Sequence, residues 1–208
     1  MPATPHRPPA ANSVRRTVAI VAFLNFAYFF VEFGVARSIG SVSLFADSID
    51  FLEDTAINVL VLVALGWTAV RRRFVGVFLS GLLLVPGAAA LWTAWDKFAD
   101  PVIADPAWLT ITGTGALLIN FTCASLLARV RHDGGSLMKA AFLSARNDVL
   151  ANIGIVGAGA LTFATGSIWP DMITGLAIAA LNAGSALEVY EAAQGEASDD
   201  DVVEKVRP

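Results

Sequence analysis

The sequence predicts an all-α polytopic membrane protein, a six-transmembrane-helix bundle with both termini on the cytoplasmic side. Three observations support this prediction. Of the 208 residues, 56% are hydrophobic and only 15% are charged, whereas about a quarter of residues are charged in ordinary soluble domains. Six apolar segments each approach the ~20 residues needed to cross a ~30 Å hydrocarbon core. Lysine and arginine are distributed unequally between the segments that connect them, which orients the helices.

The expected spans cover residues 17–36, 42–66, 74–95, 107–128, 138–164 and 168–190. The third and fourth carry no charged residue, which is typical of transmembrane helices. The first span is too long for the apolar region of a signal peptide, contains Asn25 and Glu32, and lacks an obvious small-residue cleavage site. We therefore expect it to be retained as a helix.

The spans divide the chain into three parts. Residues 1–13 form a proline-rich, disordered cytoplasmic lead, residues 14–192 form one six-helix domain, and residues 193–208 form a short acidic cytoplasmic tail. Because acids concentrate near the tail, the net charge of −4 says little about the remaining surface. No segment of the sequence is basic enough to predict binding to nucleic acid. Cys123 is the only cysteine, so neither an intrachain disulfide nor a cluster of thiolate ligands is expected.

The basic residues place the N-terminus inside. With that orientation the outer loops hold only Arg37 and Lys97, and Arg146 lies within the fifth span. The cytoplasmic segments collect the other eleven basic residues: Arg7, Arg15, Arg16, Arg71, Arg72, Arg73, Arg129, Arg131, Lys139, Lys205 and Arg207. An excess of lysine and arginine marks cytoplasmic loops, so both termini are expected in the cytoplasm.

The second span contains acids where an apolar segment is expected. In "SLFADSIDFLEDTAINVLVLVAL", Asp50 and Asp54 fall roughly 12 and 18 Å from the start of the helix near Val42. A charged aspartate at such depth costs about 2.5–3.5 kcal/mol on insertion scales. Spacings of three and four residues place Asp47, Asp50 and Asp54 on one helix face. Stacked carboxylates of this kind either share a proton or await a cation.

Asp47 and Glu53 each allow two interpretations. Asp47 lies nearest the outer end, where it is either part of the site or a neutral hydrogen-bonding residue. Glu53 lies to the other side of Asp50 and is either an acid on an ion pathway or a contact between helices.

The fifth span has a matching polar face. In "MKAAFLSARNDVLANIGIVGAGAL", Ser144 and Asp148 are four residues apart and roughly 9 and 15 Å from the cytoplasmic end, with Asn147 on the adjoining edge. Carboxylate, hydroxyl, amide and water oxygens are ligands of hard and borderline divalent cations. Asp148 is two residues from Arg146 and points in a different direction, so Arg146 is expected to reach the headgroups instead.

Five features together resemble the transmembrane domain of the cation diffusion facilitator family. They are Asn25 with Glu32, "GSVSLFADSIDFLED" entering the second span, Asn120 in the fourth, "AAFLSARNDVLANIGIV" in the fifth and "WPDMITGLAIAAL" entering the sixth. The resemblance implies a six-helix secondary transporter, usually dimeric, that exchanges a divalent metal for protons. It also implies a metal site formed by Asp50 with Asp54 and by Ser144 with Asp148. Asp47 and Asn147 are candidates for supporting that site.

The chain departs from the family pattern in two respects. Zinc-transporting relatives typically carry a histidine at one or more of the four positions, most often that of Ser144, whereas all four here bear oxygen. Oxygen ligands favour manganese or iron(II), although water can complete a zinc shell as well. The run "RND" at 146–148 also resembles the manganese-transporting branch. The family usually adds a cytoplasmic metal-binding domain, but the residues after Tyr190 are too few to bury a core.

The expected function is export of a divalent transition-metal ion (zinc, manganese, iron(II), cobalt or cadmium) in exchange for protons, across a bacterial cytoplasmic membrane. The metal is a transported substrate and no prosthetic group is expected. A homodimer would form through the membrane helices. Because nothing resembles a nucleophile and base beside a metal-held water, an enzyme is not expected. The alternative is a non-transporting membrane metal sensor or partner subunit of the same family.

Overall fold

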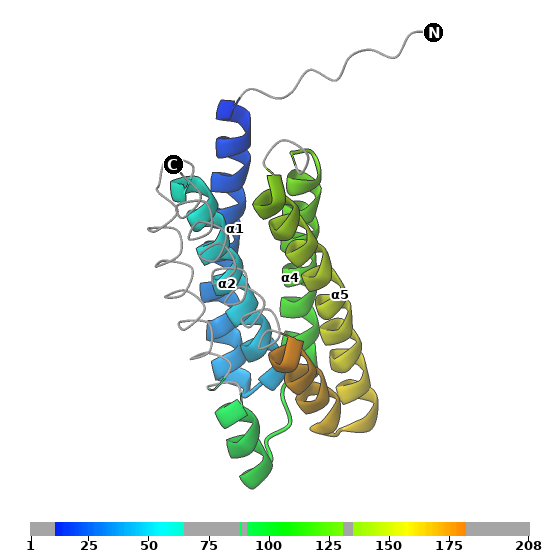
Figure 1. The fold of residues 1–208 in the computed structure, drawn as a ribbon. Helices are drawn as coiled ribbons and strands as arrows, with labels where there is room; N and C mark the ends of the chain where they lie inside the picture. Colours follow the sequence, from blue (N-terminus) through cyan, green and yellow to red (C-terminus); the bar gives the residue numbers. More distant parts are fainter. Residues whose placement is uncertain (1–10, 65–87, 89–90, 131–134, 182–208) are drawn as a thin grey trace, which may run out of the picture.

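The computed structural model describes residues 11–64, 88, 91–130 and 135–181 (Figure 1). Its four long helices are α1 (Ala11–Ile39), α2 (Val42–Ala64), α4 (Pro106–Ala128) and α5 (Gly135–Thr165). Residues 91–99 and Trp169–Leu181 form two further helical segments. The six helical segments, with no strand among the residues described, confirm the predicted all-α bundle.

The observed helices start and end close to the expected spans. The exception is α1, which begins at Ala11 and so includes residues 11–13 of the lead that was expected to be disordered. Residues 10–33 contain neither proline nor glycine, so nothing in the backbone ends the helix at the membrane surface. Most of the third span, the end of the sixth, residues 1–10 and the acidic tail lie outside the described residues.

The four long helices form a ring. α1 packs against α2 and α4, and α5 packs against α4 and α2 (Figure 1). Toward one end lies an apolar cluster that includes Val18, Leu127 and Ala145. Toward the other lies a second cluster that includes Leu44 and Ile155. Several buried polar side chains, among them Asn25, Glu32, Asp50 and Asp54, lie between these two clusters along their helices.

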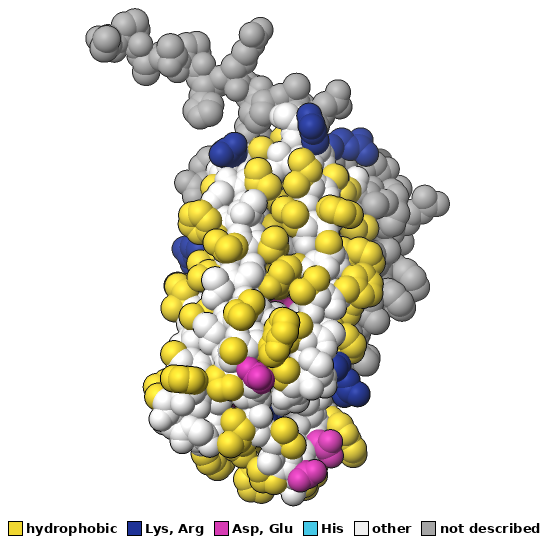
Figure 2. All heavy atoms as spheres, turned by 180° about the vertical axis from the view of Figure 1, so that it is seen from behind, with side chains coloured by type: hydrophobic (Ala, Val, Ile, Leu, Met, Phe, Trp, Pro, Cys, Tyr) yellow, Lys and Arg dark blue, Asp and Glu magenta, His cyan; other side chains and the backbone are white. Residues whose placement is uncertain are grey.

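The outer surface of the bundle suits a lipid environment. Three helical stretches, Ser13–Ile39, Pro106–Ala128 and Ala141–Thr165, are long and apolar enough to cross a membrane. Figure 2 shows hydrophobic side chains spread along the middle of one face, with several lysine and arginine side chains at its upper end and others farther down. Large apolar side chains point outward, among them Phe23, Leu118 and Phe163. In α2 the four acids interrupt the apolar sequence, and all four are buried inside the bundle.

Two local signals set the turns before α2 and α4. Gly40, after α1, has a φ of 66°, and the backbone N–H of Ser41 donates to the Ala36 carbonyl at 3.0 Å, which closes the end of α1. The side chain of Asp105 caps α4 by accepting from the backbone N–H of Ala107 at 2.9 Å and of Trp108 at 3.1 Å.

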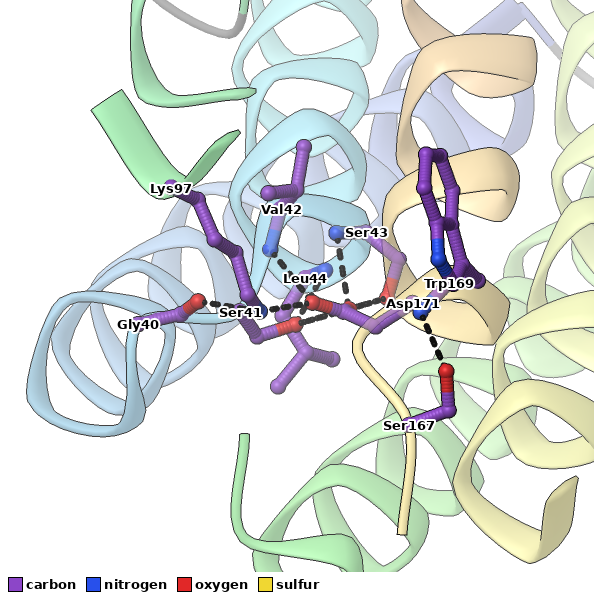
Figure 3. Close-up of polar contacts among 9 residues, drawn as sticks. All are labelled: Gly40, Ser41, Val42, Ser43, Leu44, Lys97, Ser167, Trp169 and Asp171. Carbon is purple, nitrogen blue, oxygen red and sulfur yellow. Dashed lines mark hydrogen bonds and ion pairs between the residues drawn. The ribbon is translucent and has the colours of Figure 1, made fainter. Parts of the chain in front are cut away.

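A buried ion pair lies at the start of α2. Lys97 Nζ is 2.6 Å from Asp171 Oδ2 and donates to the Gly40 carbonyl at 2.8 Å (Figure 3). Both side chains are almost fully buried. Lys97, expected in an outer loop, therefore joins segment 91–99 to the α1–α2 turn and to Trp169–Leu181.

The same carboxylate caps α2. Asp171 Oδ1 accepts from the hydroxyls of Ser41 at 2.7 Å and Ser43 at 2.6 Å and from the Ser43 N–H at 3.1 Å. Asp171 Oδ2 accepts from the N–H of Val42 at 3.0 Å (Figure 3). A negative charge at a helix N-terminus is stabilising because the first N–H groups lack helical partners. A residue more than a hundred positions away thus supplies the cap.

Candidate metal site

The acids of α2 point into the bundle. Asp47 is 0%, Asp50 8%, Glu53 6% and Asp54 4% exposed. Among the four long helices described, α1 and α5 pack most extensively on α2, so these two contribute much of the surroundings of these side chains. Burial of four carboxyl groups along less than three turns requires protons, donors or a cation to neutralise them.

Asp54 is the point at which three helices meet. Its Oδ1 accepts from the hydroxyl of Ser144 on α5 at 3.0 Å. Its Oδ2 accepts from the amide Nδ2 of Asn25 on α1 at 3.2 Å. The carboxyl group of Asp148 on α5 is also within hydrogen-bonding reach of Asp54. Two carboxyl groups can bond in this way only when one carries a proton.

Asp50 completes the group of acids on this interface. Asp148 lies close enough to both Asp50 and Asp54 for its charge to act on them. The structure therefore brings Asp50, Asp54, Ser144 and Asp148 to one interface between α2 and α5. Among the residues described, the lone salt bridge is that of Lys97 with Asp171, so none of these acids is paired with lysine or arginine there.

These side chains do not form a closed coordination shell in this conformation. Within the described ranges, no three or more histidine, cysteine, aspartate or glutamate side chains gather closely enough to hold a metal ion. Hydrogen bonds from Ser144 and Asn25 occupy both oxygens of Asp54 instead.

The three supporting candidates lie in different places. Asp47 is buried, and its Oδ1 accepts from Asn152 Nδ2 at 3.2 Å. Glu53 is buried beside Asp54. Asn147 is exposed, and its Oδ1 accepts from Arg146 Nη2 at 3.4 Å. The structure therefore places Asp47 and Glu53 near the predicted ligands and leaves Asn147 on the outer face of α5.

Sequence reasoning did not assign Asn25 and Asn152 to the site. Asn25 holds Asp54, and its own Oδ1 accepts weakly from Cys123 Sγ at 3.4 Å. Asn152 Nδ2 donates to Asp47 and also to the Asp148 carbonyl at 2.8 Å. The spacing offered a signal for one of them, because Asn152 follows Asp148 by four residues and so lies on the same face of α5.

A bundle with an apolar exterior and a set of buried acids at mid-depth defines an integral membrane protein suited to handling cations. Comparison with known families agrees with this class. The family model described as the cation efflux transmembrane domain matches residues 18–193, and the chain belongs to this family. Its members are membrane transporters of metal cations, in which the metal is the transported substrate and not a prosthetic group. A search of curated proteins finds no match.

Proposed function

We propose that this cation efflux protein exports a divalent metal ion from the cytoplasm in exchange for protons, with Asp50, Asp54, Ser144 and Asp148 as the metal ligands. The observation that supports this most directly is the contact between Ser144 and Asp54, because it joins the two predicted ligand pairs across the α2–α5 interface. Transport rather than catalysis is the activity of the family to which the chain belongs.

The donor set suits a divalent cation. Three carboxyl groups and one hydroxyl supply only oxygen, which favours manganese or iron(II), with water able to complete a shell for zinc, cobalt or cadmium. Binding would draw Asp50 and Asp148 toward Asp54 and replace the hydrogen bond that Asp54 Oδ1 accepts from Ser144, while Asn25 keeps its bond to Asp54 Oδ2. In this scheme the ion substitutes its charge for the protons that otherwise neutralise the buried acids.

Protons and metal compete for the same carboxyl groups, since only the ionised form is a ligand. A minimum of two protons for each divalent ion leaves no net charge in the membrane. Inward-directed protons would then drive the metal outward if the site opens alternately to each side.

The membrane orientation is part of the proposal. The end of the bundle that holds Arg15, Arg16 and Arg129 would face the cytoplasm, so that both termini lie inside. The start of α2, with the Lys97–Asp171 ion pair, would face outward. We further propose a bacterial cytoplasmic membrane as the location and a homodimer formed through membrane helices as the assembly.

Flux through proteoliposomes tests the function. The full chain is reconstituted around a metal-sensitive dye, and manganese, iron(II), cobalt, zinc and cadmium are compared with and without a pH gradient. We expect metal flux that depends on the gradient and is lost in Asp54→Ala. Asp100→Asn, which changes an exposed acid outside the long helices, is the matched control.

Two results would contradict the proposal, one its transport activity and the other its metal site. Metal binding by the purified protein without flux in any liposome would favour the sensor or partner subunit of the same family. Flux that persists unchanged in Asp54→Ala would show that the metal is not bound at the proposed site.

A further inference from the structure

A second group of buried acids lies apart from the proposed ligands. Glu32 on α1 and Asp47 on α2 are both 0% exposed, and their carboxyl groups are close enough for a proton on one to bond to the other. Asp47 precedes Asp54 by seven residues, which places the pair about 10 Å nearer the start of α2.

Three of the four carboxyl oxygens of this pair accept no hydrogen bond from the residues described. Among the described residues, Glu32 Oε1 and Oε2 and Asp47 Oδ2 accept no hydrogen bond, and neither does the buried amide oxygen of Asn152, whose Nδ2 donates to Asp47. A buried carboxylate with no donor is one of the costliest groups in a folded protein. The arrangement is therefore stable only if something positive is added to it.

Among the residues described, no lysine or arginine forms an ion pair with Glu32 or Asp47. Lys97 forms its ion pair with Asp171 instead. The Tyr28 hydroxyl, one turn before Glu32, donates to the Thr112 carbonyl on α4 at 2.7 Å. The other titratable groups that act on the pair are acids: Asp50 and Asp54 on α2, and Asp148 on α5. A proton satisfies the pair without further ligands, whereas a divalent ion would need more oxygens than this fully buried place offers.

On this basis, and resting on the proposed antiport function, we infer that Glu32 and Asp47 share one proton and form a proton-binding site separate from the metal ligands. Asp50 lies between Asp47 and Asp54 on the same face of α2, at steps of about 4.5 and 6 Å along the helix. The acids thus form a buried row that runs from the Glu32–Asp47 pair to the metal site.

The row gives protons a route to the ligands. As the metal leaves, its ligand carboxylates lose their counter-charge. The O–H bond on the Glu32–Asp47 pair breaks and a new O–H bond forms on Asp50, from which the proton reaches Asp54 or Asp148. The pair is then refilled from the outer side. Asn152 couples the two places, because one amide group donates to both Asp47 and the Asp148 carbonyl.

Infrared difference spectroscopy of the metal-free, full-length protein tests the pair without any transport. Raising the pH removes the carbonyl-stretch band of each protonated carboxyl group. We expect one such band to disappear from the spectra of both Glu32→Gln and Asp47→Asn, because either amide can donate to the remaining acid and leave it ionised. Asp100→Asn should retain this band. Separate bands lost in the two variants, or a spectrum unchanged in both, would overturn the inference.

A second test compares manganese binding and manganese flux through proteoliposomes. Glu32→Gln should bind manganese with nearly unchanged affinity, while the acceleration of flux by a pH gradient falls by about a hundredfold or more, the scale expected for a removed proton-transfer group. Retained manganese binding shows that this variant is folded. Gradient-driven flux equal to that of the wild type in Glu32→Gln would contradict the pair. Absence of flux in the wild-type protein would contradict the proposed function instead, and the infrared result would then decide on the pair alone.

Discussion

The hydroxyl of Ser144 donates to the carboxylate of Asp54 across the α2–α5 interface, over 3.0 Å from Oγ to Oδ1. The two residues are 90 positions apart, and each belongs to a pair of polar side chains spaced by four residues. Their contact fixes the relative height of the two helices, so that Asp148, one turn beyond Ser144, lies beside Asp54 as well. A bond between neutral donor and acid holds the interface in the absence of metal.

Replacing Ser144 with histidine should change which metal is preferred. Imidazole suits zinc, copper and nickel better than manganese, so Ser144→His should raise the zinc-to-manganese affinity ratio by about tenfold or more. Competition binding of both ions to the purified protein measures this ratio. Ser144→Ala is the matched control, since it removes the donor without adding a ligand and should weaken both ions alike. An unchanged ratio in Ser144→His would show that this position does not contact the ion.

Asn25 should act on metal binding by holding Asp54 in place. Its Nδ2 lies 3.2 Å from Asp54 Oδ2, and both side chains are buried. Partners that orient a ligand typically contribute 10–100-fold to metal affinity, so we expect Asn25→Ala to weaken binding by about tenfold. Calorimetric titration with manganese gives the affinity. Thr114→Ala, on an exposed face of α4, serves as control because its hydroxyl bonds only to the Thr110 carbonyl of its own helix. Equal affinities for Asn25→Ala and the wild type would exclude a positioning role.

The sequence predicts those parts of the protein that depend on local spacing. Helix positions follow from the apolar segments, and the shared face of Asp50 and Asp54 follows from the helical repeat. α1 illustrates the limit, because its start at Ala11 depends on how far a helix continues beyond the lipid, which hydropathy does not report.

Contacts between helices are harder to predict because they depend on which helices are neighbours. The bond from Asn25 to Asp54 requires α1 to lie against α2 at one height, which no pattern within either segment specifies. Lys97 shows the same difficulty. The sequence placed it in an outer loop, whereas in the structure it is buried in an ion pair with Asp171, 74 positions away.

The Lys97–Asp171 pair should respond unequally to loss of its two members. Asp171→Asn leaves the ammonium group of Lys97 buried without a counter-charge and weakens the cap of α2, so the expected cost is about 3–5 kcal/mol. Lys97→Met leaves Asp171 bonded to the hydroxyls and N–H groups at the start of α2, so its cost should be smaller. The double variant should be more stable than Asp171→Asn alone, because it removes the unpaired charge.

Thermal unfolding in detergent, followed with a dye that reacts with the thiol of Cys123, measures the relative stability of these variants. The chain has one cysteine, and its thiol is fully buried, so a thiol-reactive dye reports unfolding from a single place. We expect the midpoint temperature to be highest for the wild type, lower for Lys97→Met and lowest for Asp171→Asn. A lower midpoint for Lys97→Met than for Asp171→Asn would show that the lysine, and not the cap, stabilises this end of the bundle.

Gly175 should be required for the close approach of Trp169–Leu181 to α2. A Cβ at this position would lie 2.6 Å from the Val42 carbonyl carbon and 2.7 Å from the Ser43 nitrogen, and these backbone atoms belong to the first turn capped by Asp171. Because backbone cannot move aside as a flexible side chain does, Gly175→Ala should cost about 1–3 kcal/mol, as overpacking does in other cores.

Gly157→Ala is the matched control, since a Cβ there meets nothing within 4 Å and alanine stabilises a helix interior by about 0.5–1 kcal/mol. The same dye assay should therefore show a lower midpoint for Gly175→Ala and an equal or higher one for Gly157→Ala. Similar midpoints for the two variants would mean that the helices have room to separate at the start of α2 without loss of stability.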